Sequence, residues 1–240
     1  TTIAEKAQIM AQYGVDYLTV FKFNQELQTL PPERFVNEVI KQLNTKYVVA
    51  GFDYTYGPKD VANMQNLPRF AQGDFEVISV PKQTLANEKI GSTRIRTAIE
   101  TGDLTTATAL LGHPYTMTGK VVPGKQRGRQ LGFRTANLAY LPDKVLPKVG
   151  VYATKLKVKG KWHEAMTSVG YNVTFNDEQQ IFIETNIFDF DEDIYGQEIT
   201  VAWYKYLRGE IKFNNVEDLV KQLKQDETDV RNYFAQNPEN

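Results

Sequence analysis

The hydrophobic periodicity of this chain changes once, near His113 and Pro114. Before that point, segments with helical spacing alternate with short apolar or β-rich runs, which predicts a parallel sheet with helices on its faces. After it, short β-type runs follow one another, broken by Gly, Pro and Asn, as in an antiparallel barrel or sandwich. We therefore predict an α/β domain over residues 1–113 and an antiparallel β domain, barrel or sandwich, over residues 114–240.

Helix and strand signals alternate through the first domain. Good helix formers, proline at helix starts and terminal glycines mark the helices. The apolar run at residues 46–52 is of the type that is buried on both faces of a sheet. The predicted helices cover residues 4–13, 31–44, 59–72, 92–101 and 103–112, and the predicted strands cover residues 16–22, 46–52 and 75–80.

The second domain carries strand signals and then one helix. An amphipathic stripe follows Asn215, a good N-cap residue, so we expect a C-terminal helix there. The predicted strands cover residues 115–122, 150–158, 161–169, 180–190 and 198–207.

Composition excludes several classes of function. The chain has no cysteine and two histidines, which rules out disulfides, thiol nucleophiles and histidine-rich metal sites. The net charge of -1 provides no overall attraction for nucleic acid, and no apolar run is long enough to span a membrane. The absence of cysteine fits a reducing compartment, so we expect a cytoplasmic protein.

Two segments of the first domain can bind a nucleotide or an aromatic ligand. Residues 51–58 follow a predicted strand, at the edge where parallel sheets bind ligands; Asp53 can accept hydrogen bonds there, and Tyr54 and Tyr56 can stack on a ring. A turn with packed tyrosines fits the same residues. Residues 91–96 open a helix, whose N–H groups can bind phosphate. A serine N-cap beside solvated arginines fits them too. The phosphate ligands expected in this second segment are Ser92, Thr93, Arg94 and Arg96.

The second domain holds a glycine-rich basic segment at residues 119–138. Glycines allow backbone amides to approach a phosphate, and the basic side chains neutralise it. Thr135 and Asn137 carry oxygen atoms of the type that Mg²⁺ accepts beside nucleotide phosphates. A basic hairpin that touches RNA, or nothing, is the alternative. The phosphate ligands expected within the glycine-rich part are Gly119, Gly124, Arg127 and Gly128.

Glu184 is the candidate general base. In a strand it shares a face with Phe182 and Phe188, and a carboxylate among apolar side chains takes up a proton more readily. A glutamate that reaches solvent at the end of a barrel is the alternative.

Taken together and in order, these motifs resemble the bacterial bifunctional riboflavin kinase/FMN adenylyltransferase (FAD synthetase) family over nearly the whole chain. GFDYTYG at residues 51–57 resembles the family's Gly-x-Asp-Phe-x-Phe-Gly, and IGSTRIR at 90–96 resembles its Ile-Ser-Ser-Thr-x-Ile-Arg. Residues 119–133 resemble the nucleotide loop of the kinase half. Glu184-Thr185 and Leu207-Arg208-x-Glu210 follow in family order.

The resemblance implies a Rossmann-like nucleotidyltransferase domain followed by a riboflavin kinase barrel with a C-terminal helix. The barrel would transfer phosphate from ATP to riboflavin, and the first domain would join AMP to FMN, giving FAD and pyrophosphate. In the barrel, Glu184 would take the proton of the ribityl hydroxyl, and Thr135 and Asn137 would hold the magnesium nucleotide. The flavin would lie near Arg208 in the barrel and near Asp53, Tyr54 and Tyr56 in the first domain.

The chain also departs from the family pattern. A Rossmann-like domain normally begins with a central strand that here would carry a His-x-Gly-His motif, yet no histidine precedes residue 113. We expect this strand upstream of Thr1, and we expect the chain as written to be a poor adenylyltransferase. Pro-Thr-Ala-Asn reads Arg134-Thr135-Ala136-Asn137, and Glu-Thr-His reads Glu184-Thr185-Asn186. Since proline fixes φ, arginine loosens that loop, and we expect a weak or absent kinase.

Three functions follow from the sequence. The first is FAD synthesis by the complete protein, with a weak kinase. The alternatives are a fully active bifunctional enzyme and a non-catalytic flavin- or RNA-binding regulator that uses the basic loop. The expected partners are ATP, FMN, riboflavin and FAD, with no membrane and no nucleic acid; the sequence indicates no oligomeric state.

Overall fold

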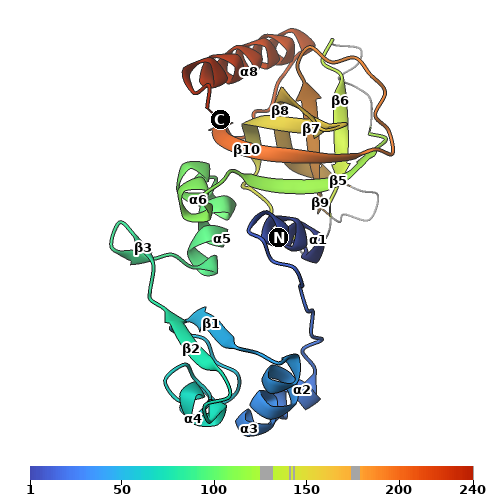
Figure 1. The fold of residues 1–240 in the computed structure, drawn as a ribbon. Helices are drawn as coiled ribbons and strands as arrows, with labels where there is room; N and C mark the ends of the chain where they lie inside the picture. Colours follow the sequence, from blue (N-terminus) through green and yellow to red (C-terminus); the bar gives the residue numbers. More distant parts are fainter. Residues whose placement is uncertain (125–131, 141, 143, 174–178, 240) are drawn as a thin grey trace. The chain divides into compact units, whose positions relative to one another are not determined.

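The computed structural model describes residues 1–124, 132–140, 142, 144–173 and 179–239 (Figure 1). The chain divides into two compact units, which are described separately. Ala7–Ile90 form the small unit, and Thr1–Lys6 together with Gly91–Asn240 form the barrel unit. The predicted domain boundary between residues 113 and 114 stays a prediction.

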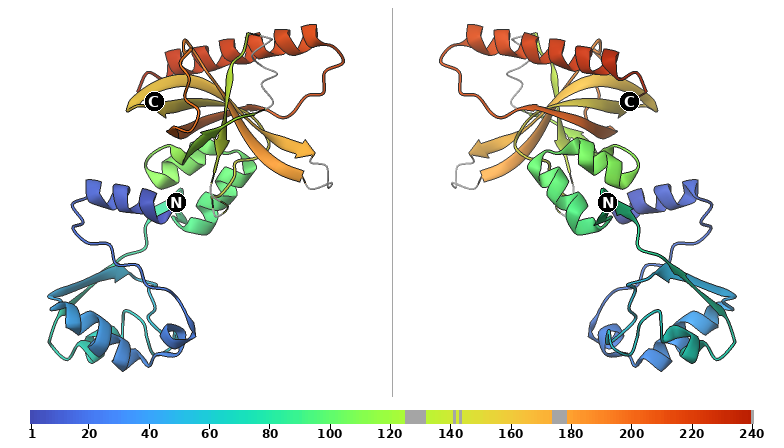
Figure 2. Two further views of the ribbon diagram at one scale, coloured as in Figure 1. Left: turned by 90° about the vertical axis from the view of Figure 1, so that its right-hand side faces the viewer. Right: turned by 90° about the vertical axis from the view of Figure 1, so that its left-hand side faces the viewer.

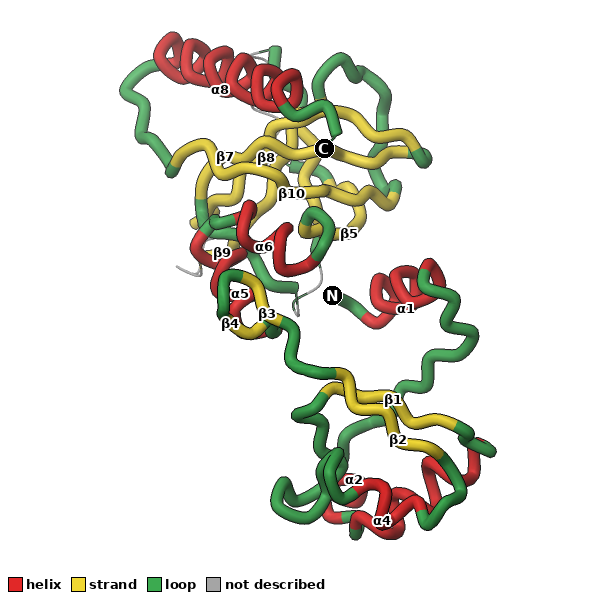
Figure 3. The backbone as a smooth tube through the Cα atoms, turned by 60° about the vertical axis from the view of Figure 1, so that its left-hand side comes forward, coloured by secondary structure: helices red, strands yellow, loops and turns green. Residues whose placement is uncertain are grey.

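The small unit has an α/β arrangement. Strands β1 and β2 pair in parallel, with Tyr47 opposite Glu76 and Gly51 opposite Val80. Its helices lie on one side of this pair (Figure 3). The elements of the small unit are α2 (Gln25–Thr29), α3 (Pro32–Phe35), the π-helix η1 (Val36–Ile40), the 3₁₀-helix η2 (Lys41–Leu43), β1 (Tyr47–Gly51), α4 (Leu67–Ala71), β2 (Glu76–Val80), β3 (Thr84–Leu85) and β4 (Glu88–Lys89).

Only one face of the parallel pair is buried. Val48 and Ala50 pack against the core cluster that includes Val36 and Leu67. Tyr47 and Val49 point the other way and are 60% and 59% exposed. The prediction that residues 46–52 are buried on both faces is therefore wrong, because the helices of this unit cover one side only.

Two predicted elements of the small unit differ from the structure. The β-rich run at 16–22 contains no strand, because β1 and β2 pair only with each other among the described residues and leave this run without a ladder partner. In the segment 59–72, only α4 is helical. Its first part forms turns, in which the Asn63 and Asn66 side-chain amides donate to backbone carbonyls in place of helical N–H groups. The predicted helix over 31–44 is confirmed as the continuous run of α3, η1 and η2.

The barrel unit is built on a closed antiparallel barrel with the strand order β10-β5-β6-β9-β8-β7. The barrel prediction is confirmed, and β6 is an additional strand inside the segment read as a glycine-rich loop. Trp203, Tyr152 and Met117 are fully buried in its core. The strands are β5 (Tyr115–Val122), β6 (Thr135–Ala139), β7 (Gly150–Val158), β8 (Lys161–Val173), β9 (Gln179–Ile187) and β10 (Glu198–Arg208).

Helices cover the barrel from two sides (Figure 2). Ile99 of α5 (Ser92–Thr101) and Leu104 of α6 (Leu104–Leu111) join the barrel core. On the opposite side, α8 (Val216–Gln236) packs through Val230 and Phe234. Asn215 caps α8 as predicted, because its side-chain oxygen accepts a hydrogen bond from the N–H of Asp218 at 2.7 Å. In the described part of the chain, no helix combines the length and apolar character needed to cross a bilayer.

A buried ion pair ties the first turn of α1 (Ile3–Gln12) to the barrel. The Lys144 ammonium lies 3.0 and 2.8 Å from the two carboxylate oxygens of Glu5, and 2.9 Å from the carbonyl of Thr116. Burial is the largest single influence on Glu5 and opposes its ionisation. The hydrogen bonds from Lys144 and from the backbone N–H groups of Thr2 and Thr118, together with the Lys144 charge, outweigh burial and lower the pKa of this carboxyl. The Lys144 and Glu5 side chains are 1% and 11% exposed, so both charges have lost most of their hydration. Each charge is compensated by the other, and removal of one would leave a buried charge without a partner.

Candidate functional site

A cavity of about 930 Å³ lies between the barrel wall and α8. Strands β6, β8 and β9, the segment that follows β10, and α8 all contribute to it. Phe182, Glu184 and Asn186 alternate along β9 and all line it. Phe182 and Glu184 therefore share a face, as the sequence predicts, whereas Phe188 packs in the cluster beneath α8.

Strand register brings the predicted kinase residues together. Thr135 lies opposite Asn186, and Asn137 lies opposite Glu184, in the β6–β9 pair. Cross-strand neighbours point to the same face, so the four side chains share one wall of the cavity. On this wall the Thr135 hydroxyl donates a hydrogen bond to the Glu184 carboxylate. The wall thus places a carboxylate, a hydroxyl and an amide side by side.

The glycines predicted as phosphate ligands have two different environments. At Gly124 a Cβ atom would collide with the Asn137 side-chain amide, so glycine lets this backbone approach the cavity wall without displacing that side chain. At Gly119, inside β5, a Cβ atom would collide with the carbonyl of Ala139 on β6, so glycine lets these two strands meet. Arg127 and Gly128 lie outside the described residues. The phosphate-binding roles of these four residues stay predictions.

Arg208 lines the cavity and is fixed by α8. Its guanidinium forms a two-pronged ion pair with Asp226, with N–O distances of 2.9 and 2.6 Å, and donates to the Gly209 carbonyl at 2.9 Å. Gln222 donates to the same carboxylate at 2.9 Å. Sequence reasoning missed Asp226, which is 2% exposed, although its spacing from Leu223 and Val230 places it on the apolar face of α8.

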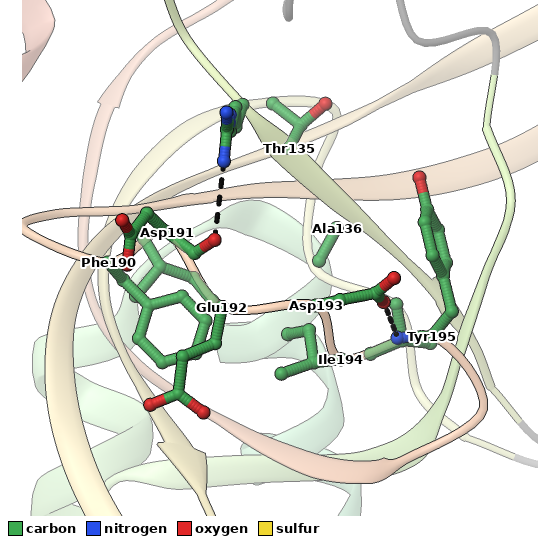
Figure 4. Close-up of a pocket in the computed structure, with 11 residues that line it drawn as sticks. Thr135, Ala136, Phe190, Asp191, Glu192, Asp193, Ile194 and Tyr195 are labelled. Atoms are coloured by element: carbon green, nitrogen blue, oxygen red, sulfur yellow. Dashed lines mark hydrogen bonds between the residues drawn. The ribbon is translucent and has the colours of Figure 1, made fainter.

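A smaller pocket of about 170 Å³ adjoins this site and shares Thr135 with the cavity (Figure 4). Its apolar walls include Val121, Ile187, Phe190 and Ile194. Figure 4 shows the turn at residues 190–195, whose acidic side chains surround the pocket.

Arg134 belongs to the wall of the same small pocket. Its guanidinium donates to the carbonyl of Asp191 at 3.2 Å, and its own carbonyl accepts a hydrogen bond from the Asn186 amide at 2.6 Å. The two substitutions singled out in the sequence, Arg134 and Asn186, are therefore in direct contact.

In the small unit, Asp53 lies just beyond the end of β1. Lys89 of β4 pairs with the Asp53 carboxylate and holds its pKa below the ordinary value. Tyr56 is buried, with ring centroids 6.0 Å from Phe35 and 6.1 Å from Phe70, while Tyr54 is 38% exposed. Tyr56 thus packs as in the alternative interpretation, and flavin binding by Asp53, Tyr54 and Tyr56 stays a prediction.

The predicted phosphate motif at 91–96 begins α5 in the barrel unit. Gly91 is the N-cap residue, and within the described residues no side chain caps this first turn. Ser92, Thr93 and Arg96 are exposed, and Arg94 is half-buried. Binding of ATP phosphates by these four residues remains a prediction.

Comparisons with known proteins agree along the chain. The riboflavin kinase family model matches residues 111–234, and the FAD synthetase family model matches residues 1–94. Bifunctional riboflavin kinase/FMN adenylyltransferases from Listeria monocytogenes and Bacillus subtilis are 48% and 38% identical; in each case the match covers 98% of this chain and 75% of the relative. A crystal structure described as a macrolide-efflux protein from Streptococcus pneumoniae superposes with a TM-score of 0.89 and 41% identity, over 96% of this chain and 75% of that one. The chain therefore belongs to the bifunctional riboflavin kinase/FMN adenylyltransferase family, transferases of flavin biosynthesis.

Proposed function

We propose that the barrel unit phosphorylates riboflavin with ATP, at a low rate, and that Glu184 is its general base. The observation that carries this proposal is the Thr135–Glu184 hydrogen bond on the wall of the large cavity. A cavity of about 930 Å³ is in the size range of sites for small organic ligands. Its lining combines apolar side chains such as Phe182 and Leu223 with a few polar groups, which suits a flavin ring carrying a polar chain.

The two pockets suggest how the substrates share the site. The riboflavin occupies the large cavity, and the adenine ring of ATP enters the small apolar pocket. Thr135 lines both, so the hydroxyl to be phosphorylated and the γ-phosphate meet beside Thr135 and Glu184. Glu184 accepts the proton of the ribityl hydroxyl, and this oxygen attacks the γ-phosphorus. The bond from the γ-phosphorus to the bridging oxygen breaks, and ADP leaves with that electron pair.

The donor set at this wall fits Mg²⁺. Thr135, Asn137 and Glu184 offer a hydroxyl, an amide oxygen and a carboxylate, all of them hard oxygen donors of the kind that magnesium prefers. Thr135 and Asn137 are the residues that would hold the ion together with the nucleotide phosphates. When bound, magnesium supplies charge neutralisation for the phosphates.

The cytoplasmic location expected from the sequence stays a prediction.

Arg134 and Asn186 support a low rate. Where the family has proline, Arg134 leaves φ unrestrained at the residue next to Thr135. Its carbonyl is the partner of the Asn186 amide, so both substitutions act on the strand end that presents Thr135 to Glu184. Phosphoryl transfer depends mainly on positioning, and small displacements of such groups are costly.

For the small unit and the helix that follows it, the FAD synthetase match over residues 1–94 supports adenylyl transfer from ATP to FMN. We propose FAD synthesis as the main activity of the complete protein, with the residues at 51–58 and 91–96 as the contacts to FMN and ATP.

The test of the kinase proposal is a flavin chromatogram after incubation with riboflavin, ATP and Mg²⁺. We expect slow formation of FMN, and a loss of at least about 100-fold in Glu184→Gln, the usual range for a general base. Glu198→Gln, at an exposed carboxylate on β10, is the matched control. Arg134→Pro combined with Asn186→His should raise turnover. Unchanged turnover in Glu184→Gln would show that Glu184 is not the general base. Turnover equal to that of the Bacillus subtilis relative would refute the proposed low rate.

A further inference from the structure

Arg134 is held at both of its ends. Its carbonyl accepts the Asn186 amide at 2.6 Å, and its guanidinium reaches the carbonyl of Asp191 at 3.2 Å. Asn186 is buried in the barrel wall, whereas Asp191 belongs to the exposed turn between β9 and β10. The arginine therefore connects the start of β6 to this turn, two segments that are far apart in the sequence.

This connection forms part of the wall of the small pocket. Arg134 and Asp191 both line the pocket, and the hydrogen bond at Asp191 is drawn in Figure 4 beside Thr135. Val121, Ile187 and other apolar residues line the same pocket. A ring-shaped ligand that fills a pocket of about 170 Å³ therefore lies against the Arg134–Asp191 hydrogen bond.

The hydrogen bond is of a kind that a ligand can replace. It joins a charged donor to a neutral carbonyl, and the Arg134 side chain is exposed, so water competes for the guanidinium. The main cost of opening it is one net hydrogen bond. That cost is added to nucleotide binding and leaves flavin binding in the larger cavity unaffected, because Arg134 is absent from the described lining of that cavity.

We propose that Arg134 is a positioning residue that restricts nucleotide entry: its side chain bridges the small pocket and is released from Asp191 when the adenine nucleotide binds. This inference rests on the proposed kinase function and adds a weakened affinity for the nucleotide to the positioning effect of Arg134 and Asn186. Asn186 contributes by fixing the backbone from which the arginine side chain extends.

The test compares Arg134→Met, which keeps the length and removes the donors, with Arg134→Lys and the parent chain. In Arg134→Met we expect the KM for ATP to fall about fivefold, the factor that one net hydrogen bond is worth, with Arg134→Lys in between. The KM for riboflavin should stay within twofold of the parent value. Lys161→Met, which removes an exposed cation from β8, is the matched control and should change neither constant.

Three results would overturn the proposal. A higher KM for ATP in Arg134→Met would mean that the guanidinium binds the nucleotide. An unchanged KM for ATP would mean that it does not restrict entry, and an equal change in the KM for riboflavin would mean that the whole site has shifted. If the parent chain forms no FMN, the kinase proposal fails. Calorimetric titration with a non-hydrolysable ATP analogue then decides the role of Arg134, with a fivefold tighter affinity in Arg134→Met expected.

Discussion

The ion pair between Arg208 and Asp226 provides the most direct test of how α8 is held on the barrel. Arg208→Met removes the guanidinium, keeps much of the side-chain length, and leaves the Asp226 carboxylate 2% exposed without its partner. Asp226→Leu removes the other charge. The double variant Arg208→Met/Asp226→Leu replaces both charges by apolar groups.

The expected loss follows from the burial of the pair. Breaking a buried ion pair by removing one partner costs about 3–5 kcal/mol, because an uncompensated charge stays behind. Gln222 still donates to the Asp226 carboxylate at 2.9 Å, so we expect the lower end, about 3 kcal/mol, for Arg208→Met. In a unit of this size that corresponds to a fall in Tm of roughly 6–12 °C. The double variant should recover most of it, since apolar replacements of buried pairs are often neutral.

Urea unfolding and thermal melts, followed by circular dichroism, measure these values. Arg231→Met is the control on the same helix: Arg231 pairs with Asp189 at 3.0 Å, but the Asp189 side chain is 80% exposed, so the loss should stay below about 1 kcal/mol. A loss in Arg208→Met no larger than in the control would refute the reasoning. Flavin titration of the double variant adds a second result: weak flavin binding in a stable protein would show that Arg208 also contacts the flavin.

Three further predictions concern other parts of the barrel unit. Although burial opposes it, the Lys144 ion pair and the backbone hydrogen bonds of Glu5 together lower the pKa of this carboxyl below 4.5. The stability that the ionised carboxylate contributes is therefore complete above pH 4.5 and is lost as the pH falls through the lowered pKa, so acid unfolding of Glu5→Gln should lack this part of the pH dependence. Thr167→Val interrupts a buried chain of threonine hydroxyls with distances of 2.7 and 2.9 Å and should cost about 1–3 kcal/mol in urea unfolding, whereas equal stability would show that these hydroxyls contribute nothing. Gly124→Ala should displace the Asn137 side chain and raise the KM for ATP more than the KM for riboflavin; equal effects on both would contradict a nucleotide role for Asn137.

The sequence predicted the barrel strands best where apolar and polar residues alternate. The expected bounds of residues 115–122 and 150–158 agree with β5 and β7, because alternation reports directly on a surface with one buried face. Strand β6 was hidden, since its five residues follow a glycine-rich segment and are too few to show a period. The strand prediction at 16–22 was wrong for the opposite reason. This run has strand-forming residues, but a strand also needs a neighbouring strand to pair with, which local composition does not report.

The residues of the candidate site were likewise predictable only in part from the sequence. Glu184, Thr135 and Asn137 could be selected from the sequence because the resemblance supplied them and the strand period predicted the face of Glu184. Their meeting depends on the β6–β9 register, which no local pattern encodes. Asp226 was missed, although an acid between Leu223 and Val230 on the apolar face of a predicted helix is a signal of a buried and paired charge. The Arg134–Asn186 contact likewise joins residues 52 positions apart.

The Glu5–Lys144 pair also bears on the order in which parts of the protein fold during synthesis. Its partners are 139 residues apart, and the small unit is inserted between them in the chain. Residues 7–90 emerge from the ribosome well before Lys144 and can collapse on their own, whereas the first turn of α1 has to wait for the barrel strands. The entropy of closing so long a loop grows only with the logarithm of its length, so the delay adds little to the equilibrium cost. A nascent chain halted before Lys144 therefore keeps Glu5 hydrated and solvent-accessible, and pulse labelling of that carboxylate would time the docking of α1.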